Sequence, residues 1–168
     1  NTELAKLFCG SNKLSSLDVT KNTKLTKLRC FLANLNTLDV TKNTQLVELN
    51  CHSNRFTSLD VTKNTLLINI NCHNNRLTSL DISHNTQLDT LYCYGNAFTT
   101  ASLDTIYCSL PDKFAANIAT IYPLLNYSDP NKAIVLATNK QNATAKNWNV
   151  KYFQNNANIA TTGRYVCT

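Results

Sequence analysis

The chain has 168 residues, a length that suits one domain or one repeat array with a closing segment. Its formal net charge is +6, but only 15% of the residues are charged and the lysines are scattered along the sequence. This balance is typical of a solvated surface and argues against nucleic acid as a partner. No apolar run approaches the roughly 20 residues of a membrane span, so no such span is expected.

The sequence repeats itself at a fixed interval. The stretch LVELNCHSNRFTSLDVTKNTL, from Leu46 to Leu66, matches its neighbours when it is shifted by 21 residues. A fixed period of roughly 20–50 residues is the signature of a stacked-repeat architecture. The five copies begin at Leu4, Leu25, Leu46, Leu67 and Leu88. The chain opens inside a repeat and has no methionine, so we expect residues to precede it.

Each copy carries apolar residues at positions 1, 4, 6, 11, 14 and 16, counted from its first leucine. Positions 4 and 6 show the period of two that marks a strand with one buried face. The run DVTKNT predicts a tight return turn, in which the aspartate caps the turn and has no catalytic role. Position 6 is always cysteine: Cys9, Cys30, Cys51, Cys72 and Cys93.

The pattern L-x-x-L-x-C-x-x-N-x-L with a short return resembles leucine-rich repeats. It is most similar to those of bacterial surface proteins of the internalin and adhesin-like kind that carry a cysteine ladder. The resemblance covers about residues 4–98. It implies an α/β fold, a right-handed solenoid with a parallel concave β-sheet and short convex turns, in which each copy packs against its neighbours. It also implies an asparagine ladder at position 9, which Ala33 interrupts, so we expect that loop to be distorted.

We interpret the repeat cysteines as small buried hydrophobes and not as metal ligands or disulfides. Neighbouring Cβ atoms in an in-register stack lie about 4.8 Å apart, whereas a disulfide prefers roughly 3.5–4.5 Å. Cys108 and Cys167 lie outside the repeats. For this pair two alternatives stay open, a disulfide that ties the tail back and two separate buried thiols.

The period fails after Phe98, which divides the chain into repeats at residues 1–98 and a C-terminal capping region at residues 99–168. Leu103, Ile106 and Leu110 predict a helix that Pro111 ends. Strands are predicted at residues 118–124 and 148–153, with a helix between them at residues 131–146. This order predicts a β-α-β cap that extends the parallel sheet and covers the last repeat.

Strand alternation turns positions 3, 5 and 7 of each copy outward onto the concave sheet. Positions 5 and 7 hold aromatic rings, histidines and an arginine that the core does not need, and such residues anchor interfaces. Two histidines without a third ligand argue against a metal site, and suggest instead that binding changes below about pH 6.5. The predicted partner-binding residues are Phe8, Arg29, Phe31, Asn50, His52, Asn71, His73, Tyr92 and Tyr94.

The sequence has no phosphate-binding glycine loop, no nucleophile elbow and no H-E-x-x-H motif, so we predict neither an enzyme nor a cofactor. The predicted function is recognition of a protein partner on the concave face, at the cell surface or in the extracellular space. Two alternatives stay open. A glycan-binding module would offer aromatic platforms flanked by amides and acids, and a structural spacer would show interchangeable polar residues.

Overall fold

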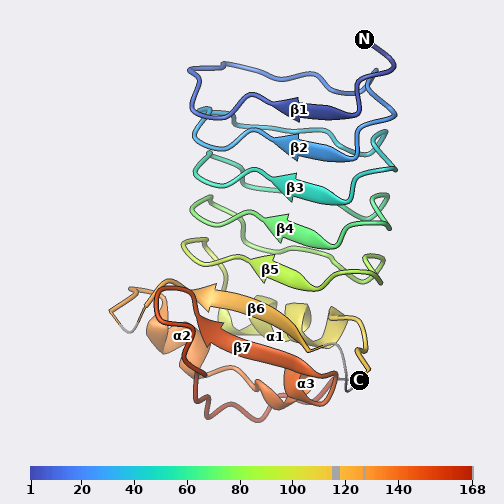
Figure 1. The fold of residues 1–168 in the computed structure, drawn as a ribbon. Helices are drawn as coiled ribbons and strands as arrows, with labels where there is room; N and C mark the ends of the chain where they lie inside the picture. The colour runs from blue at the N-terminus through green and yellow to red at the C-terminus, as the bar shows by residue number, and fades with distance from the viewer. Residues whose placement is uncertain (115–117, 127, 168) are drawn as a thin grey trace.

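The computed structural model describes residues 1–114, 118–126 and 128–167. Within them the chain builds one sheet of seven strands, each paired in parallel with the next along the chain (Figure 1). The coils descend in sequence order from the N-terminus (Figure 1). The strands are β1 Lys6–Phe8, β2 Lys27–Arg29, β3 Glu48–Asn50, β4 Asn69–Asn71, β5 Thr90–Tyr92, β6 Ala119–Leu124 and β7 Trp148–Tyr152.

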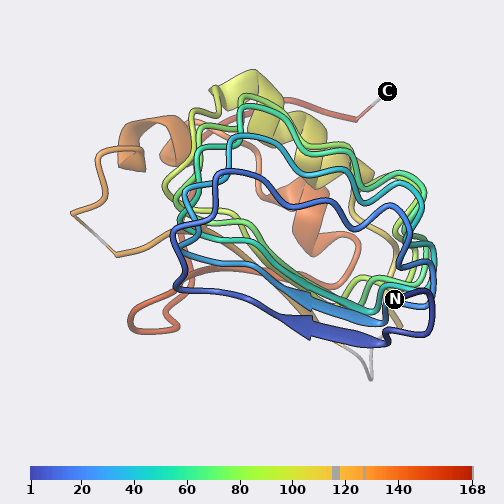
Figure 2. The same cartoon turned by 90° about the horizontal axis from the view of Figure 1, so that it is seen from above.

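The 21-residue period of the sequence sets the register of the sheet. Leu28 pairs with Leu49, and Leu49 pairs with Ile70, each step being 21 residues. All three side chains are fully buried. Seen along the stack, the coils superimpose, with the strands on one side and the return segments on the other (Figure 2). The predicted solenoid of parallel strands is therefore confirmed.

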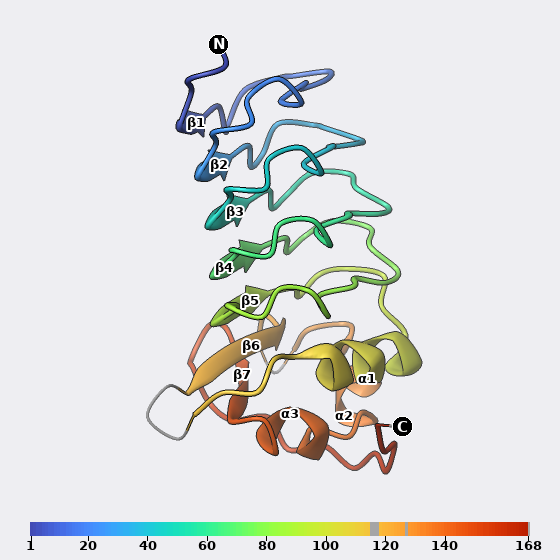
Figure 3. The same cartoon turned by 90° about the vertical axis from the view of Figure 1, so that its right-hand side faces the viewer.

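The sheet is open and runs nearly straight from β1 to β5 (Figure 3). We therefore call the predicted concave side the outward face and the opposite side the return side. The strands that belong to the repeats are only three residues long. Each places one side chain inward and two outward, as the period of two requires.

The cysteine ladder lies inside the stack. All five repeat cysteines are free thiols, and Cys30, Cys51, Cys72 and Cys93 are fully buried. Burial raises the pKa of the Cys30 thiol to about 12, because the thiolate would lose its hydration. Cys9 is only partly buried, since a single neighbouring coil covers it. The prediction of small buried hydrophobes is thus confirmed for the inner coils.

Asparagines at position 9 bond to the backbone of two coils. The amide of Asn75 donates to the carbonyl oxygens of Cys72 in its own coil, at 3.0 Å, and Cys51 in the previous one, at 3.2 Å. Its oxygen accepts from the backbone N–H of Phe56 at 3.1 Å. In the second copy Ala33 interrupts this ladder, and Asn34 adopts a left-handed φ of 59°. The expected distortion of that loop is therefore present.

A second asparagine ladder, which the sequence reading missed, runs through the return turns at position 19. Asn64 is fully buried and donates to the carbonyl oxygens of Val40, at 2.9 Å, and Asn43, at 2.8 Å. Asn43 and Asn85 repeat this pattern one coil away on either side. The asparagine of the K/H-N-T motif, which the first four copies share, therefore holds consecutive coils together on the return side.

After β5 the chain leaves the 21-residue period. Helix α1, Thr100–Ser109, begins at a capping box in which Thr99 and Ser102 each accept from the other's backbone N–H. The strands β6 and β7 then continue the parallel sheet. The helices lie on the return side (Figure 3). The predicted strand, crossover and strand are all present, and the bounds of the two strands lie within one residue of those expected.

The single helix expected over residues 131–146 is wrong. The structure has two short helices, α2 Lys132–Leu136 and α3 Gln141–Thr144. Between them the backbone N–H of Asn139 donates to the buried carboxylate of Asp104 on α1, at 2.8 Å. That bond draws the chain out of the helical path. Near the far end of α1, Cys108 forms a disulfide with Cys167, which settles that alternative.

Candidate interaction surface on the outward face of the sheet

The last residue of each repeat strand lies in one column across the outward face. The register pairs Phe8 with Arg29, Asn50 with Asn71, and Tyr92 with Tyr122. All five residues predicted at position 5 are therefore brought together. Tyr122, which extends the column onto β6, was missed because β6 lies outside the repeat period.

The N-terminal end of the column is charged. Arg29 donates from Nε to a carboxylate oxygen of Glu48 at 2.6 Å, and Lys27 contacts the other oxygen at 3.2 Å. The Arg29 hydrogen bond lowers the pKa of Glu48 despite its partial burial. The guanidinium of Arg29 also lies 5.1 Å from the ring centroid of Phe8, which is 60% exposed. Glu48 was not predicted as a site residue.

The C-terminal end of the column is aromatic. The rings of Tyr92 and Tyr122 stack with centroids 4.8 Å apart and an interplanar angle of 3°. Phe153, the residue after β7, meets both rings edge-on at 5.5 and 5.8 Å. Phe153 is 44% exposed, and the sequence reading placed it in a strand without a site role. This set of three rings is called the aromatic cluster below.

A second row of rings follows the residue at position 7. Phe31 stacks on His52 at 4.9 Å, His52 lies 4.1 Å from His73, and His73 lies 4.3 Å from Tyr94. Tyr94 in turn stacks on Phe153 at 5.3 Å. The row begins beside Gly10, where an added Cβ would lie only 2.8 Å from the ring of Phe31. The four predicted rings therefore form one continuous row of ring contacts, stacked at Phe31 and tilted further along.

The expectation that Tyr94 is exposed is wrong. Its side chain is 4% exposed, because His73 covers one side and Phe153 the other. Tyr94 therefore packs against Phe153 of the aromatic cluster and offers a partner little accessible surface. Phe31, His52 and His73 are half-buried by the same stacking.

Burial disfavours protonation of the two histidines. Burial lowers the pKa of His52, and burial together with neighbouring His52 lowers the pKa of His73 to about 3. The Nδ1 of His73 is buried and has no hydrogen-bond partner among the residues that the structure describes. In residues 1–114, 118–126 and 128–167 no group of three or more His, Cys, Asp or Glu side chains could hold a metal ion.

A shallow pocket of about 240 Å³ opens on the outward face between β3, β4 and β5. It is lined by Glu48, Leu49, Asn50, Asn69, Asn71 and Tyr92. The side-chain oxygens of Asn50 and Asn71 are buried and accept no hydrogen bond from the described part of the chain. We call this the β3–β5 pocket.

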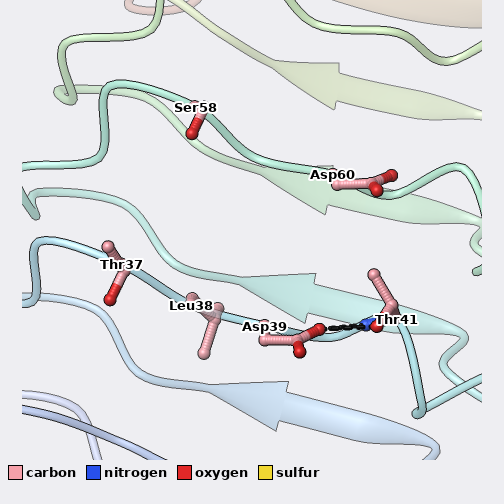
Figure 4. A pocket seen from close by; sticks show the side chains of 6 residues that line it. All are labelled: Thr37, Leu38, Asp39, Thr41, Ser58 and Asp60. Atoms are coloured by element: carbon pink, nitrogen blue, oxygen red, sulfur yellow. Dashed lines mark hydrogen bonds between the residues drawn. The ribbon is translucent and has the colours of Figure 1, made fainter.

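Hollows on the return side have a structural origin. Figure 4 shows one of them, lined by Thr37, Leu38, Asp39, Thr41, Ser58 and Asp60. Asp39 accepts from the hydroxyl of Thr41 at 2.7 Å and from its backbone N–H at 2.9 Å. These bonds lower the pKa of Asp39, so the carboxylate is a poor base, and it caps the turn as expected.

No family model matches the chain, and no curated protein sequence matches it. Solved structures do. The functional domain of InlJ from Listeria monocytogenes, which includes a cysteine ladder, is 31% identical with a TM-score of 0.68. The match covers 92% of this chain and 30% of that one, so this chain spans less than a third of the InlJ domain.

Two further structures share the fold. A leucine-rich repeat protein of Leptospira interrogans is 21% identical with a TM-score of 0.62, over 65% of this chain and 30% of that one. The leucine-rich repeat ectodomain of the receptor kinase SOBIR1 from Arabidopsis thaliana is 21% identical with a TM-score of 0.50, over 55% and 57%. None of the helices in the described part of the chain has the length and apolarity to cross a membrane.

Proposed function

We propose that this chain, a leucine-rich repeat protein whose internalin-like repeats carry a cysteine ladder, binds a protein partner across its outward face. The observation that carries the proposal is the aromatic cluster. Tyr92, Tyr122 and Phe153 gather from three different strands or strand ends, and Phe153 remains 44% exposed. Exposed aromatic rings held rigid by stacking are typical anchors of protein interfaces, because little entropy is lost when they bind.

The charged end of the outward face would orient a bound partner. Arg29 lies on the same column as Tyr92, and its ion-pair partner Glu48 lies on the neighbouring column of the outward face. Partner charges placed opposite them would set the direction of docking more than its strength. The spacer alternative is disfavoured, because the outward residues are neither bland nor interchangeable from coil to coil.

The segment at residues 99–168 contributes to the same proposal. It continues the sheet through β6 and β7, and it supplies Tyr122 and Phe153 to the face. We propose that this segment is both the cap of the repeats at residues 1–98 and part of the binding surface. Stacked repeats need such a terminal segment to cover their apolar end.

We place the protein at the cell surface or in the extracellular space. The Cys108–Cys167 disulfide is typical of an oxidising compartment, and the similarity to a receptor ectodomain and to InlJ points the same way. The solved structures share the fold and the kind of module with this chain, and the partner is to be identified by experiment.

A panel of purified extracellular proteins, tested for binding by biolayer interferometry, examines the proposal. Asn71→Arg places a bulky charge at the middle of the outward face, and Ser58→Arg places the same charge on the exposed return side. A partner should lose binding with Asn71→Arg and keep it with Ser58→Arg. The reverse pattern would move the site to the return side.

A further inference from the structure

The β3–β5 pocket differs in chemistry from the rest of the outward face. Its lining combines one aromatic ring, three carboxamides and one carboxylate around a volume of about 240 Å³. That volume is below the roughly 300–1,000 Å³ of pockets for drug-sized ligands. The pocket therefore suits one small ring and not an extended molecule.

Two side-chain oxygens of the pocket lack a hydrogen-bond partner among the described residues. The oxygens of Asn50 and Asn71 are buried, yet no donor in the described part of the chain bonds to them. A buried polar atom left unpaired costs about 1–3 kcal/mol, and in native proteins it calls for a ligand or an ordered water as an explanation. The terminal torsion of asparagine is broad, so these amides can turn toward hydroxyl groups in the pocket.

One wall of the pocket is a ring face. Tyr122 on β6 stacks parallel to Tyr92 and covers the face that points away from β4. The other face of Tyr92 points toward Asn71 on β4, and Tyr92 lines the pocket from that side. The stack on Tyr122 and the edge contact with Phe153 hold the Tyr92 ring in place.

The carboxylate at the pocket rim is already paired with cations. Both carboxylate oxygens of Glu48 are engaged, one by Arg29 and one by Lys27. Glu48 is therefore fixed as an acceptor and offers no unpaired negative charge to attract a cation. A ligand with many hydroxyl groups, an apolar ring face and no charge fits these surroundings.

We propose that the β3–β5 pocket binds a single neutral pyranose ring, as part of a carbohydrate chain. The C–H face of the sugar stacks on Tyr92, and its hydroxyl groups bond to Asn50, Asn69 and Asn71. This site shares Tyr92 with the proposed protein-binding surface, but the evidence for it is the lining of the pocket. One ring of this size gives weak binding, so affinity comes from several sugars displayed together.

Saturation-transfer NMR on the full chain tests the proposal with four free sugars, D-glucose, D-galactose, D-mannose and N-acetyl-D-glucosamine, at millimolar concentration. At least one should receive saturation, strongest on the C–H protons of one ring face. Tyr92→Ala and Asn71→Ala should abolish the signal, whereas Tyr92→Phe and Ser58→Ala should keep it. No saturation of any of the four sugars, or an unchanged signal in Asn71→Ala, would overturn the proposal.

Two further kinds of probe distinguish free polysaccharide from protein-borne glycan as the source of the sugar. Mannan and dextran represent free polysaccharide, and a purified glycoprotein before and after glycosidase treatment represents protein-borne glycan. Binding to the polymers, or binding to the glycoprotein that is lost on treatment, supports the site and names its source. Failure of both contradicts it. A protein partner that binds equally after treatment supports the protein proposal alone, so the two outcomes are distinguishable.

Discussion

The side-chain amide of Asn54 in the third copy donates a hydrogen bond of 2.9 Å to the backbone carbonyl of Cys30 in the second. The same amide donates at 3.0 Å to Cys51 in its own coil, so one side chain ties two coils. Its oxygen accepts from the N–H groups of Ala33, at 3.2 Å, and Leu35, at 3.0 Å. Asn54 thereby serves the loop of the second copy, in which Ala33 stands at position 9 in place of asparagine.

Asn54→Ala should therefore be one of the most destabilising polar substitutions in the chain. It leaves several buried backbone groups without partners, at about 1–3 kcal/mol for each group that water cannot reach. We expect a loss of about 3 kcal/mol in the free energy of unfolding, measured by urea denaturation. Asn12→Ala is the matched control, because Asn12 is exposed and bonds only within its own coil. Equal losses in both variants would contradict the inter-coil role.

Much of the fold could be predicted because the repeat fixes both pattern and register. A step of 21 residues carries Leu28 onto Leu49, so the pairing follows from the spacing alone. After the repeats end, the spacing of apolar residues is a weaker guide to the secondary structure. The predicted helix at residues 131–146 failed at Asn139, because a tertiary bond to Asp104 overrides the local helical preference.

The site residues that belong to the repeats could be predicted, whereas those contributed by the segment after the repeats could not. Position counting found Arg29, Asn50 and Tyr92 on one column, since strand alternation decides which side chains face outward. It missed Tyr122 and Phe153, which reach the face from non-repeat strands. Strand alternation also predicted that Tyr94 is exposed. Alternation tells which face a side chain points to, but it does not tell which neighbouring rings cover that side chain.

Leu49→Ala tests the shared core of the stack. Leu49 is fully buried between neighbouring coils, so truncation removes packing on two sides. We expect a loss of about 3 kcal/mol in the free energy of unfolding. Leu7 occupies the equivalent position in the first coil, which has a neighbour on one side only, and it is partly exposed. Leu7→Ala should cost about 1 kcal/mol, and a larger loss there than at Leu49 would argue against the stacked core.

The cysteine ladder predicts a specific pattern of thiol reactivity. Burial raises the pKa of Cys72 to about 12 and holds its neighbours similarly protonated and enclosed. Native protein treated with a thiol reagent should therefore react at Cys9 at most. Denatured protein should show five reactive thiols, and reduction should add the two cysteines of the disulfide. Rapid reaction of four or more thiols in native protein would show that the ladder is accessible.

His73 predicts a pH dependence of stability. Its pKa is about 3 in the folded chain and close to 6.5 when unfolded, so between these values the unfolded state binds the extra proton. The contribution of neutral His73 to the free energy of unfolding is fully present above pH 6.5 and is lost as the pH falls toward 3. His73→Phe keeps a ring in the stack and removes this titration. Urea denaturation at about pH 7 and about pH 4.5 should show a smaller acid loss for His73→Phe than for the wild type.

The carboxylates with lowered pKa values, among them Asp39 and Glu48, also lose stability in acid, but they are common to both proteins. The difference between wild type and His73→Phe therefore isolates the histidine. Identical acid losses would mean that His73 takes up its proton in the folded state as readily as in the unfolded state.

The central claim is that recognition takes place on the outward face around the aromatic cluster. The most direct test is the dissociation constant of a bound protein partner, measured for Tyr92→Ala, Tyr122→Ala and Arg29→Ala beside the return-side controls Lys42→Ala and Lys63→Ala. Anchor residues typically contribute about 2 kcal/mol or more, which is a loss of roughly 30-fold in affinity. We expect such losses for the tyrosines and changes within about twofold for the lysines. Wild-type affinity in all three outward variants, with a clear loss in Lys42→Ala or Lys63→Ala and folding intact throughout, would contradict the claim.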